Sequence, residues 1–509
     1  MRMNLKAAAA ATLAISACGT ALALPVASAI DQRVYVSGAS AQDGGIEFAV
    51  RRVCVGGASA AASTLDLYRI SGNDRVWTCE TNNSLIPGIG TGGGTGGNVR
   101  IAIYKFSSGG SGNGVNPLID NSTLAFRGVQ ASTSCSTVTP VAASGSFVAL
   151  EENSGCTNAT TENVVPQIGF SDVEPNKFTT AGRAANLTAA GANQLVMGIV
   201  VSTNLYRALQ ASQSLGNDDE YVNMPTLSST TVANAFNGNL VDWSQVTDRA
   251  GNSLPAPSSG DGTVNICRRA DSSGTQAITE ITFLRQRCTS LATTTSGFLP
   301  ADGAGGAGPN NTSTGTTAAP NFGAGRVYAG SGSTQVRDCL DAANTQGRFA
   351  IGLLSTECAP GNVTSCGSTV ARNYRFVKVD SAAPTLVDTV AGKYNFYAEQ
   401  SINSRPTLSG AGLSVRNRLL ALLSDVNVIE QINVGFRQTF GDSGLLGVPN
   451  ANAGLTAVPP YTEAAVRANA INSTFKNPQG TGTNNCQVAP AVNASFVVAD
   501  PAPILPQGL

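Results

Sequence analysis

The sequence predicts an α/β fold, and two observations lead to this prediction. Short apolar runs of strand length alternate with segments whose apolar residues recur at helical spacing. The connecting stretches are rich in small and polar residues, with 56 glycines among 509 residues. A chain of this length can bury a large core, and it is compatible with about two to four domains.

The apolar runs follow one another in a regular order along the chain. The expected strands are residues 34–36, 99–104, 167–170, 264–266, 349–353 and 374–379. Apolar residues at steps of three and four indicate a helix after residues 264–266, at positions 277, 278, 281 and 284. They indicate a second, single amphipathic helix from Val415 to Ile429. We expect both apolar stripes to pack against the core.

Three stretches and the C-terminal tail have the composition of surface segments. Residues 87–98 contain a G-x-G-x-x-G pattern, but a strand follows it where a dinucleotide site needs a helix. Residues 132–162 are expected to be an ornamental loop, and residues 291–325 are expected to be a surface insertion or a disordered segment. The tail beyond Gly441 either wraps the body or forms a contact arm.

The N-terminus has the pattern of a targeting segment. Arg2 and Lys6 precede an apolar stretch over residues 7–24, and small residues at positions 27–29 form a cleavage site. We therefore expect residues 1–29 to be a signal peptide and the mature protein to be exported, periplasmic or extracellular. A retained membrane anchor is an alternative, as is lipid anchoring at Cys18, which the apolar residues after it disfavour.

The cysteine count agrees with export. Of the 11 cysteines, cleavage after Ala29 removes Cys18 and leaves an even number, which favours disulfides in an oxidising compartment. Cys358 and Cys366 form the expected local pair, and Cys135 and Cys156 are candidates to staple residues 132–162. Pairing of Cys267 with Cys288 is disfavoured, because a strand end and the far end of the following helix lie roughly 20 Å apart.

Charge and histidine content exclude several functional classes. The net charge is -1, so no general attraction to nucleic acid is expected. The chain contains no histidine, which removes the catalytic triads and the usual zinc and haem sites. No paired carboxylates suited to hydrolysis are identifiable. We expect no enzymatic activity and no cofactor.

Four segments at strand ends have the chemistry that an oxyanion needs. They are Ser37 to Ala41, Ser107 to Ser111, Gly169 to Asp172 and Arg268 to Thr275. Small residues at a strand-to-helix turn let backbone N–H groups face a ligand, and a helix N-terminus favours negative charge. Hydroxyl groups add donors, and an arginine adds a charge-assisted clamp. Each segment alone is a weak signal, but the ordered set predicts an anion site.

In the order of these motifs, the chain resembles the phosphate-binding proteins of bacterial ABC uptake (the PstS type) and their secreted DING relatives. The family's Arg-Arg-Ala-Asp-Gly-Ser-Gly-Thr loop is matched from Arg268 to Thr275 except at Ser272. The resemblance spans roughly residues 33–435, with Leu195 to Asn204 and Lys393 to Phe396 resembling the inter-lobe crossovers. It implies a two-lobed periplasmic binding protein type 2 fold with surface insertions. Lobe 1 would comprise residues 30–195 and 396–509, and lobe 2 residues 196–395.

The resemblance also implies a set of ligand-binding residues. Arg269 would clamp the anion, and Asp271 would fix the position of Arg269. Asp172 would accept a hydrogen bond from the proton that hydrogen phosphate carries and that sulfate lacks. Ser108 would donate from the second segment, with Ser107 as the less favoured substitute. The full expected set is Ala41, Gln42, Ser108, Asp172, Arg269, Asp271, Ser273, Gly274 and Thr275.

The first loop departs from the family, because Gln42 and Asp43 replace a threonine and an aromatic residue. Asp43 would repel a dianion unless it points away. The expected function is therefore an exported solute-binding protein for an oxyanion, most favourably inorganic phosphate, for ABC-type uptake or scavenging. An ABC transporter permease is a candidate partner, and a monomer is expected. The alternative is a secreted structural or interaction protein that keeps the fold without binding phosphate.

Overall fold

The computed structural model describes the chain from Ala29 onwards, with gaps. The described residues are 29–57, 64–71, 74–130, 132–141, 150–248, 250–285, 297–300, 326–358, 360, 371–390, 393–435 and 445–447. The expected signal peptide and lipidated Cys18 therefore lie outside them, apart from Ala29. No helix among the described residues is long and apolar enough to cross a membrane.

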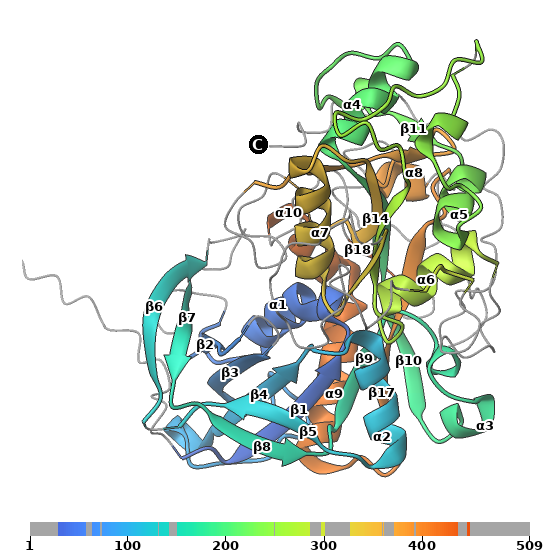
Figure 1. Ribbon diagram of the computed structural model, residues 1–509. Helices are drawn as coiled ribbons and strands as arrows, with labels where there is room; N and C mark the ends of the chain where they lie inside the picture. The colour runs from blue at the N-terminus through green and yellow to red at the C-terminus, as the bar shows by residue number, and fades with distance from the viewer. Residues whose placement is uncertain are drawn as a thin grey trace, which may run out of the picture.

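The described residues combine strands and helices around a large central sheet, which confirms the predicted α/β class (Figure 1). The strands are β1 Gln32–Gly38, β2 Asp66–Arg69, β3 Asp74–Thr81, β4 Val99–Phe106, β5 Leu124–Gly128, β6 Ser134–Val141, β7 Leu150–Thr157, β8 Thr160–Val164, β9 Ile168–Ser171, β10 Thr188–Ser202, β11 Thr226–Leu227, β12 Asn265–Arg269, β13 Val327–Gly330, β14 Ala350–Ser355, β15 Tyr374–Phe376, β16 Lys378–Val379, β17 Tyr397–Ser404 and β18 Leu445–Gly447. The helices are α1 Asp43–Val53, α2 Asn116–Asp120, α3 Ala181–Ala184, α4 Thr203–Ser212, α5 Ser229–Asn237, α6 Gly274–Phe283, α7 Ser333–Thr345, α8 Leu386–Val390, α9 Gly410–Leu423 and α10 Val426–Gly435.

The long strand β10 joins two groups of strands into one sheet. Its first part pairs antiparallel with β17, from Thr188 to Val196, and its last part pairs antiparallel with β14, from Met197 to Val201. The sheet order is β13-β12-β14-β10-β17-β9-β1-β4-β3-β2-β7-β6. In Figure 1, β1 to β9 occupy the lower part, whereas β14, α5 and α7 lie in the upper part. Buried apolar residues on both sides of β10 make one continuous core.

Parallel pairing brings the loops of interest to common edges of the sheet. In one group, β1 is parallel to β4 and to β9. In the other group, β12 is parallel to β13 and to β14. Loops that follow parallel neighbours emerge at the same edge, where ligands of open α/β sheets bind. The fold therefore gathers the first three expected segments at one edge and the fourth at another.

The expected helix from Val415 to Ile429 is in fact two helices, so that prediction is wrong. Helix α9 ends at Leu423, and α10 begins at Val426. The carboxylate of Asp425 accepts a hydrogen bond from the N–H of Asn427 at 2.8 Å, which is the bond of a helix N-cap. The apolar repeat continues across the break because both helices pack on the same core.

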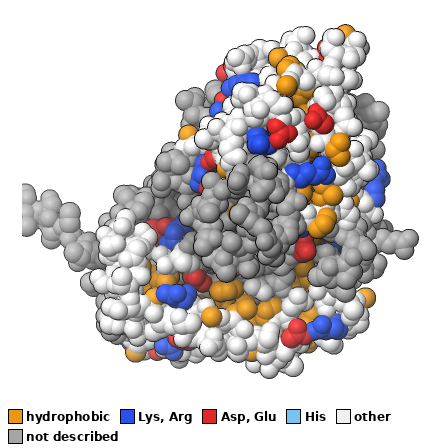
Figure 2. Space-filling view, viewed as in Figure 1, with side chains coloured by type: hydrophobic (Ala, Val, Ile, Leu, Met, Phe, Trp, Pro, Cys, Tyr) orange, Lys and Arg blue, Asp and Glu red, His pale blue; other side chains and the backbone are white. Residues whose placement is uncertain are grey.

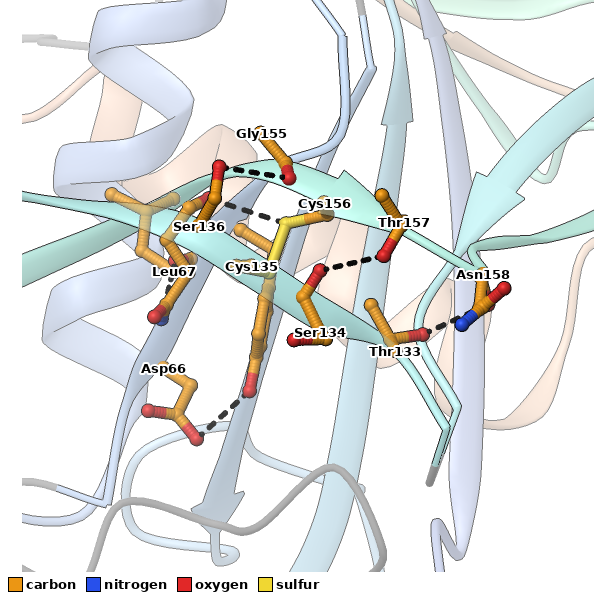
Figure 3. Close-up of a disulfide and its surroundings, with 12 residues drawn as sticks. Asp66, Leu67, Thr133, Ser134, Cys135, Ser136, Gly155, Cys156, Thr157 and Asn158 are labelled. Atoms are coloured by element: carbon orange, nitrogen blue, oxygen red, sulfur yellow. Dashed lines mark hydrogen bonds between the residues drawn. A yellow bond between two sulfur atoms is a disulfide. The ribbon is translucent and has the colours of Figure 1, made fainter.

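The described parts of residues 132–162 are strands rather than an ornamental loop. Strands β6 and β7 form an antiparallel pair, and β7 adds to the sheet beside β2. The disulfide between Cys135 and Cys156 joins the pair, as the sequence suggested, and Figure 3 shows it beside Ser134 and Thr157. The Thr and Val residues of β6 are β-branched and favour a strand, although the segment's polar composition resembles that of a loop.

Two further disulfides connect elements that are distant in sequence. Cys54 pairs with Cys79, and Cys267 on β12 pairs with Cys339 on α7 with a Cα–Cα distance of 5.8 Å. The structure thus excludes a bond from Cys267 to Cys288, as expected. Cys358 is disulfide-bonded, while its expected partner Cys366 lies outside the described residues.

The remaining surface segments are described only in part. Residues 87–98 form an irregular loop tied to the carboxylates of Asp31 and Glu80, and β4 follows it, which agrees with the rejection of a dinucleotide site. Of residues 291–325, only 297–300 are described, with Phe298 packed on Phe236. From the tail beyond Gly441, β18 pairs with β10. On the face in Figure 2, charged side chains are sparse and of both signs.

Candidate functional site

The loop between β12 and α6 forms the centre of the site. Ser273 is the N-cap of α6, and its hydroxyl accepts a hydrogen bond from the N–H of Gln276 at 3.4 Å. The N–H groups of Gly274 and Thr275, in the first turn, have no acceptor within the helix. Ser273 and Thr275 are buried. This end of α6 therefore offers buried donors and a positive dipole end to an anion.

Arg269 lies buried at the end of β12, with only 3% of its surface exposed. Its Nη2 donates to the carbonyl of Ser331 at 3.0 Å, and its Nη1 donates to the hydroxyl of Ser333 at 3.2 Å. Its Nε has no partner among the described residues. Burial lowers the pKa of Arg269 to about 10, so the side chain is still a cation at neutral pH.

Asp271 does not fix Arg269, so the expected role of this carboxylate is wrong. Its carboxylate is exposed and forms an ion pair with Nη1 of Arg268 at 2.9 Å. Arg268 also donates to the backbone carbonyl of Arg269. The two arginines are successive residues of a strand, so their side chains point to opposite faces. The turn after the strand brings Asp271 to the Arg268 side.

Asp172 follows β9 and lies against the N-terminus of α6. A Cβ atom placed on Gly274 would lie 2.6 Å from Cβ of Asp172. The carboxylate accepts hydrogen bonds from Nε2 of Gln400 at 2.6 Å and from the hydroxyl of Ser111 at 3.1 Å. Burial raises the pKa of Asp172, although these hydrogen bonds and the charge of Arg269 oppose the shift. The third and fourth sequence segments are thus in contact.

The residue that follows the second segment, Gly112, reaches the fourth segment through its backbone. The N–H of Gly112 donates to the carbonyl of Ser272 at 2.9 Å. The Ser107 hydroxyl already has a partner within the protein, because it donates a hydrogen bond to the carboxylate of Asp43 at 2.7 Å. Ser108 is half-buried, and its carbonyl accepts a hydrogen bond from Asn113. Ser108 therefore remains the better candidate of the two serines, and Ser111 is a contact to Asp172 that the sequence did not single out.

The first loop uses its side chains for internal contacts. Ala41 and Gln42 are buried, and Nε2 of Gln42 donates to Oδ1 of Asn193 on β10 at 2.6 Å. Asp43 pairs with Arg75 and with Lys105. Burial opposes ionisation of Asp43, but these two cations hold its pKa below the ordinary value. The charge of Asp43, which threatened to repel an anion, is therefore compensated within the protein.

Sequence reasoning missed Lys105, Glu357 and the loop from Ser331 to Ser333. Lys105 is the second charged residue of β4, after Arg100, and its Nζ donates to the carbonyl of Gly38 at 2.9 Å. Burial raises the pKa of Glu357 to about 8, with the charges of Asp43 and Asp172 adding to the shift. Of these three, only the loop had a signal in the sequence, because its Gly and Ser residues lie between an apolar run and a helix.

A cavity of about 550 Å³ lies apart from these residues, on the outer face of α7. Asp338, Asp341 and Arg372 line it, and Arg372 forms ion pairs with both carboxylates. The two carboxylates outnumber the one arginine, so the charged lining of this cavity does not favour an anion. No group of His, Cys, Asp and Glu suited to a metal ion occurs among the described residues.

No protein-family model matches the chain, and no curated protein sequence matches it. Solved structures do match. A Clostridium perfringens protein, crystallised with bound phosphate and assigned to phosphate ABC transporter substrate-binding proteins, shares 10% identity at a TM-score of 0.39, over 79% of this chain and 98% of that chain. An ABC-type phosphate transport receptor from Vibrio cholerae shares 12% identity at a TM-score of 0.38, over 79% of this chain and 98% of that chain.

PstS from Borrelia burgdorferi is a third similar structure, with 11% identity and a TM-score of 0.33, over 80% of this chain and 98% of that chain. The names of the first two proteins state phosphate or phosphate transport. The chain is thus similar, at low identity, to phosphate-transport binding proteins. What this chain binds has to be argued from its own residues.

Proposed function

We propose that this protein is an exported solute-binding protein that holds an oxyanion, and that its ligand is inorganic phosphate. One observation carries the proposal. Arg269 is a buried cation whose hydrogen-bond partners, Ser331 and Ser333, are neutral, and no carboxylate among the described residues forms an ion pair with it. A buried charge is costly unless an opposite charge or strong hydrogen bonds compensate it. An anionic ligand supplies that compensation.

The surrounding donors support an oxyanion in particular. The N-terminus of α6 offers the N–H groups of Gly274 and Thr275. Lys105 places a second buried cation beneath the first loop. Asp172, whose pKa is raised by burial, faces the same helix end. A carboxylate beside the anion favours a ligand that still carries a proton, because that proton can bridge the two oxygens. Hydrogen phosphate has such a proton, and sulfate has none.

The direct test is isothermal calorimetry on residues 30–509 with phosphate and with sulfate. The expected result is saturable phosphate binding, weak sulfate binding, and loss of phosphate binding in Arg269→Ala. Asp172→Asn should reduce the preference for phosphate over sulfate. Tight sulfate binding that Asp172→Asn leaves unchanged would contradict the specificity argument.

A second candidate is a secreted structural or interaction protein without a ligand. The commitment of Gln42 to Asn193 and of Asp43 to Arg75 favours it, since neither side chain of the altered first loop is left to bind phosphate. Absence of binding to any oxyanion, together with self-association in sedimentation experiments, would select this candidate. A phosphate-monoester hydrolysis assay at background level would exclude a phosphatase.

The proposal extends to the arrangement and partners of the chain. Residues 30–195 with 396–509 would form one lobe and residues 196–395 the other, joined where β10 exchanges partners. Hinge bending at the crossovers would close the lobes over the anion. The disulfides support an oxidising compartment, periplasmic or extracellular. An ABC transporter permease is the proposed partner for uptake, with the binding protein as a monomer.

A further inference from the structure

The loop after β13 lies beside the loop after β12. The two strands are parallel, with Arg269 opposite Gly330, and the N–H of Ala270 donates to the carbonyl of Gly330 at 2.9 Å. Each strand leads through a short Gly/Ser loop into a helix, α6 in one case and α7 in the other. The parallel pairing of β12 with β13 therefore places residues 331–333 next to Arg269.

The contacts of this loop occupy one edge of the Arg269 guanidinium. Nη1 donates to the hydroxyl of Ser333, and Nη2 donates to the carbonyl of Ser331. A guanidinium has five N–H groups in a planar fork, so the edge formed by Nε and the second N–H of Nη2 remains. Nε is buried and has no partner among the described residues. That edge has the geometry for a bidentate oxyanion.

The chemistry of the two acceptors matters as much as their position. A carbonyl and a hydroxyl orient the guanidinium without cancelling its charge, whereas a carboxylate in the same place would neutralise it. Asp271, the carboxylate expected to hold Arg269, instead pairs with Arg268 and is exposed. The covalent link between Cys267 and Cys339 ties β12 to α7 and keeps the two loops together.

We infer that residues 331–333 are the positioning element of the anion site, in which the Ser333 hydroxyl and the Ser331 carbonyl aim Arg269 while leaving its charge free for the ligand. This inference rests on the proposed function. Ser333 acts through its side chain and Ser331 through its backbone. The two serines are therefore a matched pair for mutation.

The test is phosphate calorimetry combined with thermal unfolding on variants of the mature chain, with Arg269→Ala as the reference for lost binding. Ser333→Ala should weaken phosphate binding about tenfold, as expected for loss of a hydrogen bond to a charged group. Ser333→Thr keeps the hydroxyl and should restore most of the affinity. Ser331→Ala keeps the carbonyl, and Asp271→Ala removes only the exposed pair, so both should stay within about twofold of the unsubstituted protein.

Ser333→Asp distinguishes a role of Ser333 in positioning Arg269 from a role in stabilising the fold. Its carboxylate should pair with Arg269, so the melting temperature should equal or exceed that of the unsubstituted protein while phosphate affinity falls at least about a hundredfold. Phosphate binding that is lost in Arg269→Ala but unchanged in Ser333→Ala and Ser333→Asp would overturn the inference alone. No phosphate binding by the unsubstituted protein would overturn the proposed function and the inference with it.

Discussion

Gly274→Ala is a sharp test of the contact between the third and fourth segments. The added methyl group would lie 2.6 Å from Cβ of Asp172 and would also collide with the hydroxyl of Ser111. Carbon atoms in contact prefer a separation of about 3.5–4.0 Å, so Asp172 and α6 must move apart by about 1 Å. Overpacking of this kind costs about 1–3 kcal/mol.

The same displacement should weaken anion binding, because it separates Asp172 from the N–H groups of α6 that the ligand must bridge. If the whole cost of overpacking is subtracted from the free energy of phosphate binding, the affinity drops about 5- to 150-fold. Calorimetry gives the affinity, and urea unfolding gives the stability. The matched control is Gly44→Ala in the first turn of α1, where a new Cβ meets nothing within 4 Å. It should leave binding unchanged and stabilise the protein by about 0.5–1 kcal/mol. A Gly274→Ala protein that is as stable and binds as tightly as the original would refute the reasoning.

Two further predictions concern pH and the disulfide at the site. Burial raises the pKa of Glu357 to about 8 from an ordinary 4.5, so the stability it contributes is full below its ordinary pKa and is lost as pH rises to 8. The unsubstituted protein should therefore lose stability relative to Glu357→Gln between pH 5 and 9. Its phosphate affinity should also fall relative to that variant, because ionised Glu357 repels the anion. Parallel pH curves for the two proteins would contradict this prediction. Replacing Cys267 and Cys339 by serine removes a disulfide between residues 72 positions apart. On the chain-entropy model, the free energy of unfolding measured with denaturant should fall by about 4 kcal/mol. A fall below about 1 kcal/mol would show that packing alone holds β12 on α7.

Much of the site's framework was accessible from the sequence because strand ends and Gly/Ser turns leave local patterns. The positions of Ser273, Gly274 and Thr275 at a helix start followed from the β12 run and the spacing of apolar residues after it. The approach of Asp172 to this helix came from the resemblance rather than from any local signal.

The contacts that were predicted wrongly or missed depend on distances that no local sequence pattern encodes. Asp271 is close in sequence to both Arg268 and Arg269, and only the geometry of the turn selects Arg268. The loop from Ser331 to Ser333 was missed because β13 is four residues long and follows a Gly-rich stretch of similar composition. The pKa of Glu357 is raised first by burial and then by charges far away in sequence, including Asp43, and no local pattern encodes either cause.

A crystal structure of residues 30–509 grown with arsenate tests the central claim most directly, because arsenate mimics phosphate and its arsenic atom can be located by anomalous scattering. The account predicts an arsenic peak with arsenate oxygens within hydrogen-bonding distance of Nε of Arg269 and of the N–H groups of Gly274 and Thr275. The carboxylate of Asp172 should lie against the same anion. An arsenic peak elsewhere, for example beside Arg372 in the cavity on α7, or no peak at all, would contradict it.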